Sequence, residues 1–193
     1  MRKTALAAIA SIAAFISPAQ ATIVDLPANG QWNGFTVDSF VGPSYGNSWI
    51  DYADGSNLLF NFTIAAGQVG TLTLVDGGFA GDTYALTNFG SLIGSSSSVA
   101  QGDTSGNIAL DFDSALADVS FSSGVFTFAA GSYSIGGYML QSVLDNGSPL
   151  FASEGALKLT VAPVPEPATY ALMLSGLLAT TLVARRRNDK NKR

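Results

Sequence analysis

Two aspartates separated by a single residue form the pair in this chain whose spacing best suits chemistry. Asp111 and Asp113 flank Phe112, and in an extended strand residues two apart point to the same face of the sheet. Two carboxylates on one face can divide acid and base roles in glycoside hydrolysis, or bind a hard cation through oxygen. A solvated strand face is the ordinary alternative.

A second group of oxygen ligands lies in residues 51–57, where Asp51 and Asp54 precede a glycine turn. The segment lacks the spacing and the closing glutamate of an EF-hand loop, and an acidic turn explains it equally well. Calcium at Asp111 and Asp113, or at Asp51 and Asp54, is the one metal that the sequence suggests; otherwise we predict no cofactor.

A third acidic segment, residues 76–82, has an aspartate at each end and three glycines between them. Without a lysine and a following helix it is no phosphate-binding loop. We interpret it as a hairpin connection.

Four aromatic residues gather near the start of the chain's central part: Trp32, Tyr45, Trp49 and Tyr52. Aromatic rings stack on the apolar faces of sugars, so these residues are candidates for a carbohydrate-binding patch. Packing in the core or at its rim is the alternative, and burial of the two tryptophans would favour it.

The chain contains no cysteine and no histidine. These absences exclude a disulfide framework, the usual zinc ligands and every nucleophile that relies on a histidine base. We therefore predict that the protein is not an enzyme.

The elements that must position these residues are strands, because apolar and polar residues alternate with a period of two. Residues 58–64, for example, place Leu58, Phe60, Phe62 and Ile64 on one face. Glycine, asparagine, aspartate and serine separate such segments. We expect strands at 34–41, 58–64, 69–75, 83–89, 107–112, 118–121, 125–128, 132–143 and 156–161. Their number and spacing predict an all-β fold, with a single jelly-roll-like β-sandwich over residues 22–162.

The charge of this central part is strongly negative. Residues 22–164 hold 12 of the 14 acids but only one base, Lys158, so their formal net charge is −11. Such a body repels phosphate backbones, which excludes nucleic acid as a partner. It attracts divalent cations or cationic polymers instead.

The first 21 residues read as a cleavable signal peptide. Arg2 and Lys3 precede an apolar run over residues 4–16, and Ala19 and Ala21 fit a small-x-small cleavage site. The mature chain is then expected to start at Thr22. A retained transmembrane helix is the alternative, but the apolar run is short for one.

The last thirty residues combine a proline-flanked acid, an apolar run and a basic end. Pro165, Glu166 and Pro167 belong to a proline-rich segment, residues 163–167. Pro165 and Pro167 have a fixed φ and no amide donor, so this stretch is expected to be extended and outside a sheet interior. Residues 168–184 form an apolar run at the short end of what spans a bilayer. Arg185, Arg186 and Arg187 open a basic tail, residues 185–193, that the positive-inside rule keeps in the cytoplasm. We predict a transmembrane helix at 168–184.

This tail resembles the PEP-CTERM sorting signal of Gram-negative bacteria, which is also catalogued as an ice-binding protein C-terminal domain. The resemblance is carried by Pro165, Glu166 and Pro167, the apolar residues 170–178 and the three arginines. It implies recognition by an exosortase, a membrane-embedded peptidase, with the precursor anchored in the inner membrane and then released to the cell surface or medium. It also implies association with exopolysaccharide and biofilm matrix.

Three functions remain open for the body. The first is a non-enzymatic structural or adhesive protein of the cell surface or matrix. The second is a carbohydrate-binding module for exopolysaccharide. The third is a carboxylate-based hydrolase, which requires a cleft with two facing acids about 5–10 Å apart.

Overall fold

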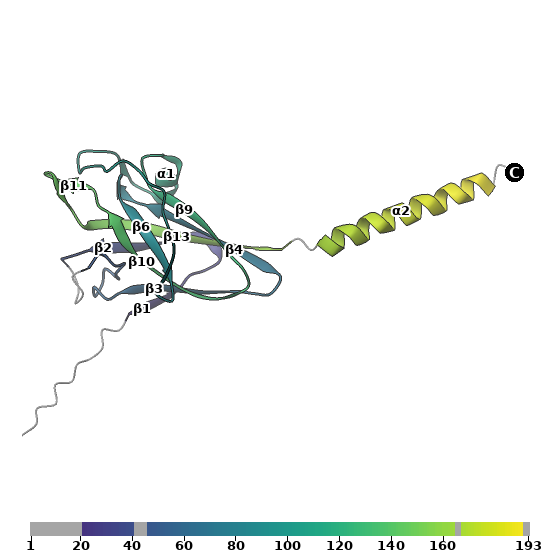
Figure 1. The fold of residues 1–193 in the computed structure, drawn as a ribbon, viewed down its shortest axis with the longest axis horizontal. Helices are drawn as coiled ribbons and strands as arrows, with labels where there is room; N and C mark the ends of the chain where they lie inside the picture. Colours follow the sequence, from purple (N-terminus) through teal and green to yellow (C-terminus); the bar gives the residue numbers. More distant parts are fainter. Residues whose placement is uncertain (1–20, 41–45, 165–166, 191–193) are drawn as a thin grey trace, which may run out of the picture.

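The computed structural model describes residues 21–40, 46–164 and 167–190. Two β-sheets pack face to face, and a long C-terminal helix projects away from them (Figure 1). Among the described residues, β1 and β3 pair in parallel and all other strand pairs are antiparallel.

The first sheet has five strands in the order β1-β3-β10-β6-β7. These strands are β1 (Thr22–Asp25), β3 (Leu58–Ile64), β10 (Gly131–Gln141), β6 (Thr83–Asn88) and β7 (Ser91–Ser95). The second sheet has four strands in the order β2-β13-β4-β9. They are β2 (Asn29–Asp38), β13 (Ala152–Pro163), β4 (Gln68–Asp76) and β9 (Ser123–Phe128).

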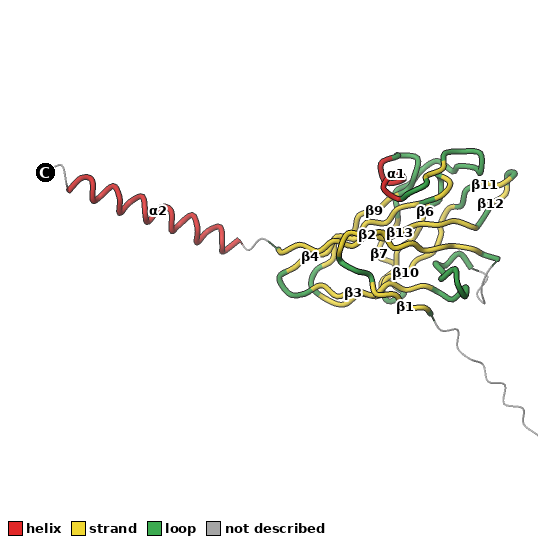
Figure 2. Tube along the Cα trace, turned by 180° about the vertical axis from the view of Figure 1, so that it is seen from behind, coloured by secondary structure: helices red, strands yellow, loops and turns green. Residues whose placement is uncertain are grey.

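Two small ribbons and two helices complete the part of the fold that the structure describes. The ribbons pair β5 (Gly78–Phe79) with β8 (Ile108–Ala109), and β11 (Leu144–Asp145) with β12 (Ser148–Pro149). Helix α1 (Phe112–Ala117) follows β8, and helix α2 (Pro167–Lys190) follows β13. In the tube view, α1 lies at one margin of the sandwich and α2 beyond the end of β13 (Figure 2).

The strand order agrees with the predicted jelly-roll-like sandwich. Setting β1 and the short ribbons aside, the remaining strands numbered one to eight along the chain lie in the orders 1-8-3-6 and 2-7-4-5. Successive strands therefore alternate between the sheets in most steps, as in a double-sheet jelly roll.

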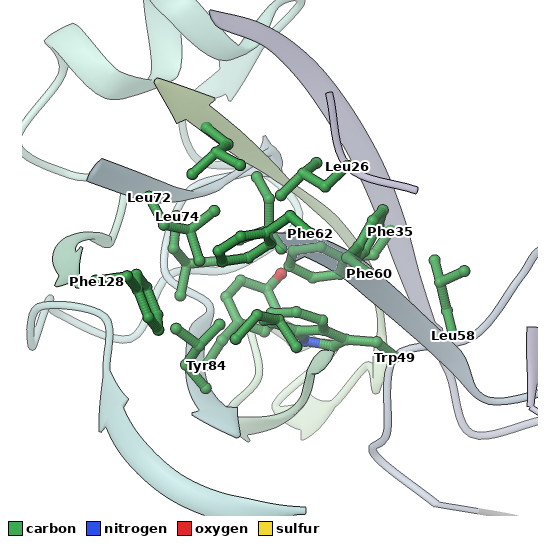
Figure 3. Packing of buried hydrophobic residues seen from close by; sticks show 14 of the residues in the cluster. Leu26, Phe35, Trp49, Leu58, Phe60, Phe62, Leu72, Leu74, Tyr84 and Phe128 are labelled. Carbon is green, nitrogen blue, oxygen red and sulfur yellow. The ribbon is translucent and has the colours of Figure 1, made fainter. Parts of the chain in front are cut away.

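The core lies between the sheets, as Figure 3 shows. On β3, Leu58, Phe60, Phe62 and Ile64 are all buried, which confirms the period-two prediction for that strand. The opposite sheet contributes Phe35, Leu72, Leu74 and Leu157. At ~25 cal/mol per Å² of apolar surface, these side chains supply the main stabilising term.

A second, smaller cluster lies where α1 covers part of the second sheet. Its buried members are Val75, Ala80, Ala115, Phe121 and Ala156.

Helix α1 corrects two of the predicted strands. The strand predicted over 107–112 is shorter than expected, because only Ile108–Ala109 form β8, and the strand predicted at 118–121 is wrong. Asp111 caps α1 by accepting the Ser114 N–H at 2.8 Å, which starts a helix where alternation suggested a strand.

Gly137 in β10 gives a direct test of this packing. An added Cβ would touch the Trp49 ring and lie 2.5 Å from the Ala85 carbonyl oxygen. We expect Gly137→Ala to lower the free energy of unfolding by about 2 kcal/mol, because an overpacked core must shift to admit the methyl group. Chemical denaturation measures the loss. Gly34→Ala is the matched control, since its nearest neighbour would be 3.8 Å away; equal losses in both variants would contradict this account.

Candidate functional site

The sorting tail continues directly from the core of the body. Strand β13 pairs with β4 as far as Pro163, opposite Gln68, and the Val164 N–H donates to the Gly67 carbonyl at 2.8 Å. Pairing of the sheet therefore includes Pro163, the first residue of the segment 163–167.

Several predicted tail and signal residues lie outside what the structure describes. Residues 1–20, with Ala19, and the pair Pro165 and Glu166 are not described, whereas Ala21 precedes β1. Pro167 and the arginines Arg185, Arg186 and Arg187 fall within helix α2, but their side chains are not described.

Helix α2 is exposed along its described side chains. Every residue from Tyr170 to Thr181 is exposed, including Leu172 and Leu174. Among the residues that the structure describes, no helix combines the length and hydropathy that crossing a membrane requires. The transmembrane helix predicted at 168–184 is therefore not confirmed.

The structure separates the roles of Asp111 and Asp113. Asp111 caps α1, and the Ser114 N–H and Oγ–H hold the pKa of its carboxyl below the usual value. Asp113 accepts hydrogen bonds from Trp32 Nε1 at 2.9 Å and from Lys158 Nζ at 3.3 Å, and these two donors lower its pKa. Both aspartates are exposed on a helix turn, so they do not form the pair on a strand face that their spacing predicted.

Asp51 and Asp54 stabilise a local turn. Asp51 Oδ1 accepts the Ala53 N–H and Asp54 Oδ1 accepts the Ser56 N–H, both at 2.9 Å. The Ser56 N–H lowers the Asp54 pKa. Within the described ranges, no group of three or more acidic, histidine or cysteine side chains is arranged to hold a metal ion. Calcium binding stays a prediction.

The aromatic residues proposed as a carbohydrate patch do not form one surface. Trp49 is buried in the core, stacked on Phe35 with centroids 3.9 Å apart. Trp32 is partly buried beneath Lys158, whose Nζ lies 4.1 Å from the ring centroid. Tyr52 is exposed, and Tyr45 lies outside the described residues.

The chemistry-bearing group that sequence reasoning missed is a buried acid cluster formed by Asp76, Asp82 and Tyr84. The two aspartates are 0% and 1% exposed, and the tyrosine is fully buried. Asp76 Oδ2 accepts the Gly81 and Asp82 N–H groups at 3.3 and 3.2 Å, and Asp76 Oδ1 accepts the Tyr84 hydroxyl at 3.3 Å. Asp82 Oδ1 accepts the Val143 N–H at 2.6 Å.

Burial changes the protonation of this cluster. Loss of hydration raises the pKa of Asp76 to about 8, and the negative charge of Asp82 adds to the shift. Burial also raises the pKa of Asp82, and it raises that of Tyr84 well above its usual value. Asp76 is therefore protonated at neutral pH, when it can donate a hydrogen bond to the Tyr84 oxygen.

One acid of the cluster borders a cavity of about 570 Å³. Asp82 lines it together with Asp38, Tyr52, Ser153 and Glu154. Asp76 is not among the lining residues. A cavity lined by several carboxylates favours a cationic or hydroxylated ligand. Asp76, whose pKa is about 8, cannot act as an acid on that ligand because it does not line the cavity.

The class of protein is indicated by the C-terminal segment that follows the β-sandwich body. Residues 163–187 match the family model described as the PEP-CTERM protein-sorting motif, which confirms the motif predicted here. That motif indicates an exported protein that an exosortase processes.

Two further comparisons concern the whole chain. No curated protein matches it. Among solved structures, the pre-peptidase C-terminal domain of a collagenase from Bacillus anthracis aligns at 12% identity and a TM-score of 0.34. That alignment covers 76% of this chain and 98% of the domain.

Proposed function

We propose that this chain is a non-enzymatic structural or adhesive protein, which an exosortase sorts from an inner-membrane-anchored precursor to the cell surface or matrix. The observation that carries the proposal is the direct continuation of core strand β13 into the sorting motif at residues 163–187. With so short a connection, the folded body is held close to the membrane until the tail is cut.

Two properties of the chain support this role. The exposed leucines of α2 need a covering, and a bilayer supplies one for the precursor. The formal charge of −11 over residues 22–164 keeps the body soluble after release.

A carboxylate-based hydrolase is the weaker candidate. It needs a protonated acid and a second carboxylate facing one cleft. Asp76 is the acid that is protonated at neutral pH, but of the two aspartates only Asp82 lines the cavity. The two acids therefore do not face one cleft.

Surface display and adhesion can be tested in the source organism. An antibody against the body should label intact cells, and cells that lack the protein should attach to a solid surface several-fold less. Labelling that requires permeabilised cells would contradict surface display. Unchanged attachment, with labelling intact, would contradict the adhesive role alone.

A further inference from the structure

A second groove, of about 770 Å³, runs over β1, β3 and β10 to the hairpin between β6 and β7. It lies apart from the acid cluster, and it shares no residue with the cavity that Asp82 borders. The sorting tail contributes no residue to it either. Ligand binding in this groove therefore does not depend on surface sorting.

Polar side chains form two adjoining rows across the floor of the groove. Asp25 on β1 is paired with Asn61 on β3, and Asn61 is paired with Ser134 on β10. In the next row, the Thr63 and Ser132 hydroxyls lie 3.1 Å apart. Directly paired residues point to the same face of a sheet, so these side chains can hydrogen-bond to the same ligand.

Asn61 has a buried amide oxygen that the described residues leave without a partner. Its Oδ1 accepts no hydrogen bond from them. A buried polar atom without a partner costs about 1–3 kcal/mol. Since no described donor satisfies this oxygen, the amide can turn to a ligand that offers a hydroxyl donor.

Phe89 supplies an aromatic ring at the end of the groove. It forms a two-residue hairpin loop with Gly90, and both residues have positive φ, 47° and 78°. Asparagine followed by glycine is the preferred pair in such a turn, and a bulky residue there is strained by about 1–2 kcal/mol. The Phe89 side chain is nevertheless 69% exposed, so core packing does not explain it.

We propose that this groove binds a neutral glycan. A pyranose has an apolar face that stacks on Phe89 and a rim of hydroxyls that match the Asn61 amide and the neighbouring hydroxyl row. Asp25 is the one carboxylate among the lining residues, and no lysine or arginine lines the groove in the described part of the chain. That charge disfavours anionic polysaccharides.

The test measures binding of neutral and anionic oligosaccharides to the full chain in mild detergent. Calorimetric titration should detect at least one of the neutral hexamers of glucose, xylose or mannose at millimolar concentration, and no binding of an alginate hexamer. We expect Asn61→Ala to weaken the binding of that neutral hexamer about tenfold, which is the effect of losing ~1.4 kcal/mol.

Phe89→Asn separates binding from stability. It replaces a strained residue with the one that this turn prefers, so the melting temperature should rise while glycan affinity falls about tenfold or more. Phe40→Ala is the matched control, because Phe40 is also an exposed aromatic residue but lines neither this groove nor the cavity that Asp82 borders. Its affinity should equal that of the wild type.

Three results would overturn the proposal. They are no binding of any neutral hexamer, equal binding of the alginate hexamer, and unchanged affinity in both Phe89→Asn and Asn61→Ala.

Discussion

Glu166→Ala should stop processing of the tail almost completely while the body stays folded. Glu166 is the one acid between the two prolines of the motif, and prolines keep the neighbouring backbone extended and outside a sheet. A peptidase binds its substrate as an extended segment, which is the backbone that two flanking prolines favour. We expect the uncut precursor to accumulate in the membrane fraction and the released form to disappear from immunoblots.

The chain offers one matched control for this experiment. Glu154 is the only other glutamate, and it lies exposed on β13 within the body. Glu154→Ala should leave processing at the wild-type level, since it changes the same side chain outside the motif. A mature product of normal size and amount from Glu166→Ala would show that exosortase handling does not depend on this carboxylate.

The strands of the sandwich were the most predictable part of the body. Leu58–Ile64 is predicted with its observed bounds because four large apolar residues alternate without interruption. The expected strand at 34–41 instead begins at Asn29 and ends at Asp38. The first residues of β2 are polar and do not alternate with apolar residues, so the sequence pattern does not reveal them as a strand. Hydrogen bonding to β13, rather than burial, keeps this part extended.

Side-chain chemistry was harder to predict because it depends on contacts between distant segments. Asp111 and Asp113 fit a strand face by spacing, yet a cap at Asp111 turns the chain into α1. Conversely, residues 76–82 looked like a simple glycine turn. Only the folded sheet brings the Val143 N–H against Asp82, 61 residues away, and encloses Asp76 beneath Tyr84. Alternation predicts which strand residues are buried, but it carries no information about which turn becomes enclosed.

Because the buried acids have raised pKa values, we expect the free energy of unfolding to fall as the pH rises. The folded-state pKa of Asp76 is about 8, against 3.8 in the unfolded chain. Its stabilising contribution is therefore complete below pH 3.8 and is lost progressively as the pH rises to about 8. The maximum slope is about 1.4 kcal/mol per pH unit, so the loss between about pH 5 and pH 8 is at most ~4 kcal/mol. The raised pKa of Asp82 acts in the same direction.

Exposed acids act in the opposite direction at lower pH. Hydrogen bonds from nearby serines lower the pKa of Asp54, Asp103, Asp111 and Asp118. Their contribution is present above pH 3.8 and is lost as the pH falls below it. Together, the two groups place maximum stability on the acidic side of neutral.

Asp76→Asn should remove most of the decrease in the free energy of unfolding that the wild type shows as the pH rises above its pH of maximum stability. The asparagine oxygen can accept the Gly81 and Asp82 N–H groups, and its amide N–H can donate to the Tyr84 oxygen, as a protonated aspartate does. We expect urea denaturation of this variant to show a flatter profile between about pH 5 and pH 8 and a higher stability than the wild type at about pH 8. Asp54→Asn is the control, because a pKa lowered from 3.8 leaves that group ionised across this range in both states. A wild-type profile as flat as that of Asp76→Asn would mean that Asp76 gives up its proton at an ordinary pH despite its burial.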